Sequence, residues 1–111
     1  MDSPVDSEVR SFPRKLLRCN AVVVVEGLAP MRSKTKDVSL GGVCVILPEP
    51  LPIGAKCMVA FEASLHGRMV QVKATAKVAY SVLSGVEGFR TGVQFIHLDE
   101  TSDKMLTELM M

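Results

Sequence analysis

Two short polar segments near the amino terminus carry residue types that suit an anionic, guanine-containing ligand. The first is Arg10-Ser-Phe-Pro-Arg14 and the second is Asp37-Val-Ser-Leu-Gly-Gly42. Guanidinium groups are planar, permanently charged donors that pair with phosphates and with the acceptor edge of guanine. Asp37 can accept from the donor edge of the same base, Ser39 can donate or accept, and Gly42 lets a ligand approach the backbone. Together the two segments predict a site for an anionic guanine nucleotide.

The length and charge of the chain limit the classes of protein it can belong to. With 111 residues it has room for one domain, and its net charge of +1 produces no overall field toward nucleic acid or a membrane. Positive charge is local, because four basic residues and no acid lie between Glu8 and Glu26: Arg10, Arg14, Lys15 and Arg18. Such a run is usually a solvated flank, and only its pairing with the Asp-x-Ser-x-x-Gly segment favours a binding site.

The sequence also predicts a cytoplasmic protein that does not insert into a membrane. Residues 1–10 are acidic and lack the apolar stretch of a secretory signal. The apolar runs 21–25 and 43–47 are too short to span a bilayer. The cysteines are odd in number and lack Cys-x-x-Cys spacing, as expected of buried free thiols: Cys19, Cys44 and Cys57.

Alternating apolar and polar residues predict an all-β fold. The pattern is clearest over 69–80, where the apolar positions from Val70 to Val78, together with Tyr80, take one face. Six segments of strand length are separated by turns rich in glycine and proline: 20–26, 31–37, 43–47, 57–63, 69–80 and 89–95. Segment 31–37 is polar enough to be expected at a sheet edge. Six short strands without intervening helices predict an antiparallel barrel or sandwich.

The end of the chain follows a different period. Its apolar residues recur at helical spacing: Met105, Leu106, Leu109 and Met110. They follow three candidate helix caps, Asp99, Thr101 and Ser102. We therefore expect a flexible leader over 1–9, a β-domain over 10–98, and a short helix within 99–111 that packs on it.

These residues resemble a PilZ domain, the bacterial receptor module for cyclic di-GMP. The resemblance rests on Arg10-x-x-x-Arg14, Asp37-x-Ser39-x-x-Gly42 and the late segment Gly92-Val-Gln-Phe95, and it covers roughly residues 10–98. It implies a six-stranded antiparallel barrel with a short C-terminal helix. It also implies a receptor that is not an enzyme and that uses no cofactor besides its ligand, cyclic di-GMP.

The resemblance also implies a role for each motif residue. Arg10 and Arg14 would grip the phosphates and the Hoogsteen edge of guanine, or stack on its face. Asp37 would accept from the guanine N–H groups, and Ser39 would hydrogen-bond the base or a phosphate. Gly42 would keep the turn open where the ligand passes, with Gly41 beside it serving the turn itself. The segment around Arg10 would become ordered on binding and signal to a separate effector protein.

Two features leave alternatives open. Arg14-Lys-Leu-Leu-Arg18 is a second Arg-x-x-x-Arg in an overlapping register. We prefer the first register, because Arg-x-Phe-Pro-Arg is similar to how the family enters its first strand. This leaves Arg18 as a structural residue or an auxiliary phosphate contact. Many family members double the first arginine, whereas here its neighbours are Val9 and Ser11. Ligand stoichiometry therefore stays open, as does the choice between a monomer and a homodimer.

The residue that would stack on the ligand from a later strand is also open. The chain has no tryptophan, and three residues are candidates for this wall: Arg68, Tyr80 and Arg90.

Three other functions fit the sequence less well. The histidines, His66 and His97, form no recognisable triad with serine and aspartate, and a capped helix explains the acids after His97 better than a metal site does. A nucleic-acid binder would interleave aromatic residues with its basic ones, and the chain has only four Phe and one Tyr. The strongest alternative is a PilZ-type protein adaptor that binds no nucleotide, as in type IV pilus assembly. Such proteins usually lack the two motifs found here.

Overall fold

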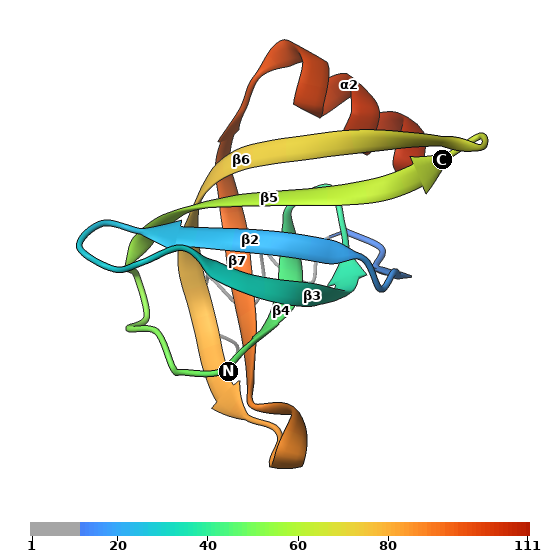
Figure 1. Ribbon diagram of the computed structural model, residues 1–111. Helices are drawn as coiled ribbons and strands as arrows, with labels where there is room; N and C mark the ends of the chain where they lie inside the picture. The colour runs from blue at the N-terminus through green and yellow to red at the C-terminus, as the bar shows by residue number, and fades with distance from the viewer. Residues whose placement is uncertain (1–11) are drawn as a thin grey trace.

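The computed structural model describes residues 12–111, and these form a closed antiparallel barrel with a helix at one end (Figure 1). The strands are β1 (Lys15–Leu16), β2 (Asn20–Val25), β3 (Met31–Val38), β4 (Gly42–Leu47), β5 (Lys56–Leu65), β6 (Arg68–Leu83) and β7 (Phe89–Leu98). A 3-10 turn, η1 (Gly85–Glu87), joins β6 to β7, and the helix is α2 (Glu100–Leu109). The strand order is β1-β3-β2-β5-β6-β7-β4, and an added β3–β4 pairing closes six strands into a barrel. The predicted barrel and C-terminal helix are confirmed.

The core of the barrel is built by strict alternation along the strands. In β5 the inward positions are buried and the residues between them are not, and Phe61 is only 1% exposed. The inward positions of β6 from Val72 to Val78 repeat the pattern. A tight turn at His66-Gly67, where both residues have positive φ, connects β5 to β6.

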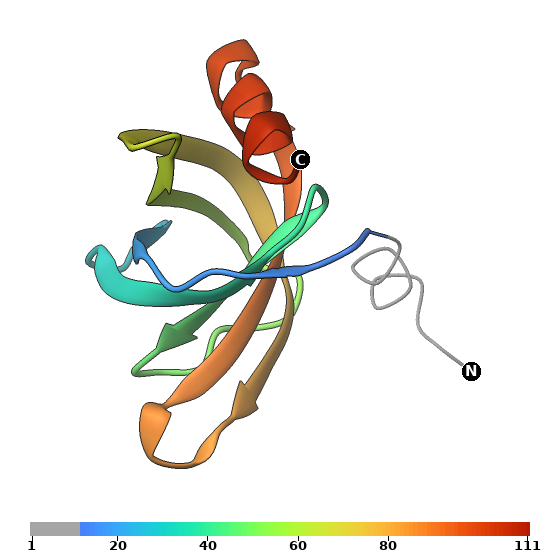
Figure 2. The ribbon, with the colours of Figure 1, turned by 90° about the vertical axis from the view of Figure 1, so that its right-hand side faces the viewer.

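Helix α2 closes one end of the barrel (Figure 2). Its N-cap is Asp99, one of the three predicted candidates. The Asp99 side chain accepts a hydrogen bond from the Ser102 backbone N–H at 2.7 Å. Leu106 and Leu109 are buried and belong to the same apolar core as the strands. The helical spacing of the C-terminal apolar residues is therefore explained by packing on the barrel.

The amino-terminal segment is fastened to β3 by a buried threonine. The Thr35 hydroxyl is fully buried, accepts from the Cys19 N–H at 3.0 Å and donates to the Leu17 carbonyl. These bonds hold the break between β1 and β2 against β3. Arg14 directly precedes β1, so this attachment fixes the direction from which its side chain approaches the barrel.

Lys15, in β1, also connects this segment with the end of the helix. Its ammonium group donates to the backbone carbonyl oxygen of Leu109 at 3.1 Å. A cation at the carboxyl end of a helix satisfies an otherwise unpaired carbonyl and interacts favourably with the helix dipole.

The expectation that 31–37 forms a sheet edge is wrong. β3 pairs with β1 and β2 along one side and with β4 along the other. Its polar residues, such as Arg32 and Lys34, face solvent on the outside of the barrel, where a strand can be polar without being at an edge. Barrel closure covers both sides of the strand.

Register shifts interrupt the strand pairing at three places, and two of them change which face of the sheet a predicted site residue occupies. In β3 the register shifts between Thr35 and Asp37, so that Lys36 is the extra residue. In β6 it shifts between Val78 and Tyr80. The prediction that Tyr80 shares the inward face of Val78 is therefore wrong, because the added residue turns Tyr80 to the outside of the barrel.

Candidate functional site

One row of residues crosses four strands on the outer face of the barrel. Asp37 of β3 pairs with Cys44 of β4, Cys44 pairs with Gly92 of β7, and Gly92 pairs with Tyr80 of β6. Directly paired residues project to the same face of a sheet. The row therefore gathers a carboxylate, a thiol and a phenol around a position without a side chain.

Gly92 creates the space that the tyrosine ring occupies. A Cβ atom added at Gly92 would overlap three carbon atoms of the Tyr80 ring. The ring thus lies directly against the backbone of Gly92, where a residue with a side chain would not fit. Gly92 belongs to the late segment that supported the family resemblance, although its role was not evident from the sequence.

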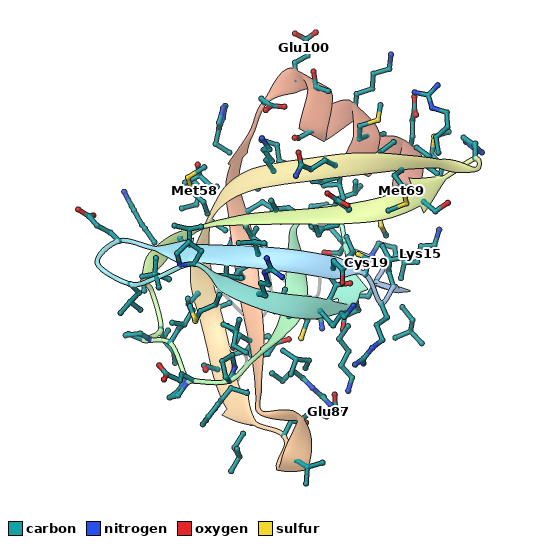
Figure 3. The ribbon with its side chains drawn as sticks, viewed as in Figure 1. Lys15, Cys19, Met58, Met69, Glu87 and Glu100 are labelled. Atoms are coloured by element: carbon teal, nitrogen blue, oxygen red, sulfur yellow. The ribbon has the colours of Figure 1, made fainter. Side chains whose placement is uncertain are left out.

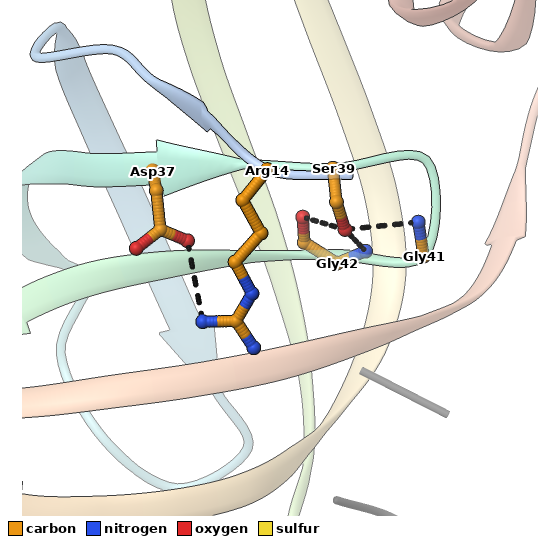
Figure 4. A network of polar contacts seen from close by, with 5 residues as sticks. All are labelled: Arg14, Asp37, Ser39, Gly41 and Gly42. Carbon is orange, nitrogen blue, oxygen red and sulfur yellow. Dashed lines mark hydrogen bonds and ion pairs between the residues drawn. The ribbon is translucent and has the colours of Figure 1, made fainter. Parts of the chain in front are cut away.

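Arg14 reaches this row from the segment that precedes β1. Its guanidinium lies 3.8 Å from the Asp37 carboxylate (Figure 4), and the two side chains are 34% and 19% exposed. The guanidinium also lies close enough to the Tyr80 hydroxyl to lower the pKa of that phenol, although burial outweighs this effect. Arg14, Asp37 and Tyr80 therefore line one recess of about 10 Å³, too small to enclose a nucleotide, so that a ligand must lie across its mouth.

The two neutral groups of the recess stay protonated at neutral pH. Burial, together with the contact to Cys44, raises the pKa of Tyr80 to about 12. Burial likewise raises the pKa of the Cys44 thiol. Among the described residues that line the recess, Asp37 is therefore the only negative charge, opposite the positive charge of Arg14.

Ser39 and the two glycines form the β3–β4 turn beside the recess. The Ser39 hydroxyl accepts from the backbone N–H groups of Gly41 and Gly42, both at 3.2 Å (Figure 4). Ser39 is only 2% exposed, so its hydroxyl is directed into the turn. A Cβ atom at Gly42 would overlap the Val93 carbonyl oxygen, which gives this glycine a steric role in addition to the predicted one.

The remaining predicted residues lie at different places. Arg10 is outside the described residues. Arg18 is exposed between β1 and β2 and does not line the recess. Of the three candidates for the later wall, Tyr80 lines the recess, Arg90 lies on the neighbouring row between Ile46 and Val82, and Arg68 stands at the far end of β6.

Sequence reasoning missed Cys44 as part of this site. It predicted three buried free thiols, and the structure confirms that all three cysteines are free, with Cys44 and Cys57 buried and Cys19 half-buried. Cys44 is 2% exposed but lies under Tyr80 rather than in the apolar core. The run Val43–Leu47 is apolar on both faces, so its alternation does not mark Cys44 as outward-facing.

The described residues contain neither a metal-binding cluster nor a membrane-spanning helix. Residues 12–111 contain no group of three or more histidine, cysteine, aspartate or glutamate side chains arranged to hold a metal ion. Within the same range, no helix has the length and apolar character needed to cross a membrane.

Comparisons with known proteins agree with the fold of the chain. The PilZ domain family model matches residues 8–111. The fold is similar to the inhibitor of motility MotI/DgrA of Bacillus subtilis (TM-score 0.74, 16% identity, covering 87% of this chain and 47% of MotI). It is also similar to YcgR of Escherichia coli, in a crystal structure with c-di-GMP (TM-score 0.71, 17% identity, covering 90% of this chain and 43% of YcgR).

A third structure of similar fold is itself a single domain. It is the PilZ domain of CeSA from a cellulose synthesizing bacterium (TM-score 0.58, 17% identity, covering 88% of this chain and 94% of that domain). This chain thus spans about half the length, or less, of MotI and YcgR. No curated protein sequence matches it. The family model covers nearly the whole chain, and the chain belongs to the PilZ domain family.

Proposed function

We propose that this chain is a cyclic di-GMP receptor module and that its outer-face recess is the centre of the binding site. The observation that carries the proposal is the meeting of Arg14, Asp37 and Tyr80 at one place on the barrel. Family membership supports it, as does the crystal structure of the similarly folded YcgR with c-di-GMP.

The Arg14–Asp37 pair supplies what a guanine nucleotide needs. At 3.8 Å and partly exposed, the pair is loose and gives little stability, so opening it costs little. Arg14 then donates to a phosphate or to the guanine O6 and N7 atoms, while Asp37 accepts from the N1 and N2 hydrogens. The ligand replaces one weak intramolecular pair by two charge-assisted sets of hydrogen bonds.

The other motif residues complete the contact. Arg10 joins Arg14 on the phosphates, and its arrival on the bound ligand changes the surface that a separate effector protein reads. Gly42 leaves room for the ligand, while Ser39 either keeps the turn in shape by accepting from the N–H groups of Gly41 and Gly42 or rotates its hydroxyl to the ligand. The Tyr80 ring, packed against Gly92, is the aromatic group on which a base would stack.

The contacts account for binding of useful strength. A charge-assisted hydrogen bond contributes roughly 1.5–3 kcal/mol net. Four or five such bonds, reduced by the cost of fixing the partners, leave about −8 kcal/mol, which corresponds to micromolar affinity.

Isothermal titration calorimetry tests the proposal directly. Cyclic di-GMP is titrated into the parent chain, into Arg14→Ala and into Asp37→Ala, with GTP as the control ligand. Arg32→Ala and Asp103→Ala are matched control variants, because they remove one exposed charge of each sign away from the recess. Binding of cyclic di-GMP that is lost in the first two variants and kept in the controls supports the receptor function and gives the stoichiometry.

The opposite result favours the alternative function. If the folded parent produces no heat with cyclic di-GMP, the chain is a nucleotide-independent adaptor of the PilZ type, and the recess has another role.

A further inference from the structure

One edge of β6 is left open where β7 departs from the barrel. β6 runs from Arg68 to Leu83, but its pairing with β7 begins only at Ala74, which faces Leu98. β5 pairs with the whole of this stretch on the other side. Over residues 69–73, no strand in the described part of the chain pairs with the second edge of β6 (Figure 1).

The backbone of this edge points away from β5. The Lys73 N–H donates to the Ser102 hydroxyl of α2 at 2.9 Å, which places it on the open side. Main-chain groups of alternate residues point to the same edge of an antiparallel strand. The N–H and C=O groups of Gln71 and Met69 therefore face the open side as well, and Met69 stands near the end of the β5–β6 hairpin (Figure 3).

A groove runs along this edge, between β6 and α2. Its first part is a hollow of about 320 Å³ beside Gln71, Lys73 and the first turn of the helix, and its second part is a hollow of about 130 Å³ beside Arg68 and Glu108. The two hollows share Val70 and Met105 as common lining residues. The groove therefore has an apolar centre with polar ends, and an unpaired strand edge forms one wall.

We propose that an extended segment of a partner protein binds in this groove as an added β-strand, in the position that β7 leaves at Leu98. An open strand edge presents a row of main-chain donors and acceptors that another extended chain satisfies and a helix cannot. The apolar centre at Val70 and Met105 takes one apolar side chain of the incoming segment. Charged side chains on either side meet Lys73 and Arg68 from the strand and Asp99 and Glu108 from the helix.

This groove is separate from the nucleotide site. The open stretch is the first part of β6, whereas Tyr80 lies near its other end, past the bulge. The inference therefore does not depend on cyclic di-GMP binding, and the two can fail independently.

Proline and alanine at position 71 form the central test. The Gln71 N–H faces the groove and not β5, so Gln71→Pro removes one groove donor while keeping the β5 pairing, and proline is tolerated where the N–H of an edge strand faces outward. Gln71→Ala keeps the donor and is the matched control. The probe is a synthetic peptide selected on the parent chain from a displayed library of random peptides of about ten residues, long enough to span the edge.

The expected result is a clear separation of the two variants. The peptide binds Gln71→Ala within about twofold of the parent and Gln71→Pro about tenfold or more weakly. Both variants keep the parent's response to cyclic di-GMP. Met105→Glu places a charge in the apolar centre and leaves the β6 edge intact, and it should also lower the affinity for the peptide. This variant replaces Gln71→Pro in the test if the proline variant fails to fold.

Amide hydrogen exchange gives a second readout. Bound peptide should slow exchange at Met69 and Gln71 but not at Met58 on the far side of β5, where the strands are already paired. The inference is overturned if no peptide is selected, or if the selected peptide ignores both Gln71→Pro and Met105→Glu. It is also overturned if these amides are already protected in the parent because a second copy covers the edge.

Discussion

Asp37 and Tyr80 share the outer face of the barrel because each follows a β-bulge, at Lys36 in β3 and at Ala79 in β6. Without the extra residue, period-two alternation would carry Asp37 inward with Thr35 and Tyr80 inward with Val78. A carboxylate inside this apolar core would be costly. The site therefore depends on two local irregularities in strands that are not neighbours.

The Lys36 bulge has a contact of its own. The Lys36 ammonium lies 3.5 Å from the Glu87 carboxylate of η1, at the tip of the β6–β7 connection. Through this pair the bulged part of β3 touches the hairpin whose strands supply Tyr80 and Gly92.

Removing either charged partner of the recess should weaken cyclic di-GMP binding strongly. We expect Arg14→Ala or Asp37→Ala to cost about 2–3 kcal/mol, or roughly 30–150-fold in affinity, because each removes charge-assisted hydrogen bonds. The thermal midpoint should change little, since the pair is partly exposed. Calorimetry and thermal denaturation check the two quantities, and unchanged affinity in both variants would show that the site lies elsewhere.

The two registers of the Arg-x-x-x-Arg motif predict different effects of alanine substitutions on the affinity for cyclic di-GMP. If Arg10 pairs with Arg14 on the ligand, Arg10→Ala should weaken binding by about tenfold or more, whereas Arg18→Ala should change it by about twofold or less. The measurement is the dissociation constant for cyclic di-GMP at a fixed ionic strength. The reverse order of effects would assign the site to Arg14 and Arg18.

Gly92→Ala should disturb the recess through the tyrosine ring. The added Cβ overlaps Tyr80, so we expect a loss of about 1–3 kcal/mol in the free energy of unfolding and weaker ligand binding. Removing the ring first should relieve this overlap. In a Tyr80→Ala background, Gly92→Ala should therefore cost much less in chemical denaturation, and equal costs in the two backgrounds would disprove the steric argument.

The ionisation of Tyr80 can be observed alone, because the chain has one tyrosine and no tryptophan. Phenolate absorbance should titrate near the ordinary pKa of 10.0 in denaturant and at about 12 in the folded chain. Since the folded-state pKa is the higher one, the folded chain holds the proton more tightly. The contribution of protonated Tyr80 to the free energy of unfolding is present below about pH 10 and is lost as the pH rises toward about 12. Coincident titrations of folded and denatured chain would contradict this assignment.

Ser39→Ala tests whether the hydroxyl organises the turn. It leaves the buried N–H groups of Gly41 and Gly42 without their acceptor, so we expect about 1–3 kcal/mol lower stability in chemical denaturation. Ser64→Ala, on the exposed face of β5, is the control. If Ser39→Ala leaves the free energy of unfolding unchanged but lowers the affinity for the ligand, the hydroxyl contacts the ligand instead of organising the turn.

The regular parts of the fold could be predicted from the sequence because burial acts on every second residue. Alternation in 57–63 and 89–95 marked the strands that became β5 and β7, and helical spacing after Asp99 marked α2. β1 was missed, since two exposed residues carry no pattern. The polar strand β3 was assigned to an edge because a sequence does not show whether a sheet closes on itself.

The candidate site could be predicted only in part. Residue chemistry and spacing indicated Arg14, Asp37 and the glycine turn, which the structure brings together around one recess. A bulge has no compositional signal, so the count that placed Tyr80 beside Val78 failed at one inserted residue. Cys44 was hidden in an apolar run for a related reason, because the outer face of β4 is covered by the site itself.

The Lys15–Leu109 hydrogen bond joins the last turn of α2 to the residue next to Arg14. We expect a ligand that displaces Arg14 to shift the neighbouring Lys15 as well, and with it the hydrogen bond from Lys15 to the helix. Thermodynamic linkage is reciprocal, so a factor by which nucleotide changes the fraying of α2 is the factor by which fraying changes nucleotide affinity. If the ligand is cyclic di-GMP as proposed, a protein that binds the end of this helix would change the nucleotide concentration at which the site is half occupied.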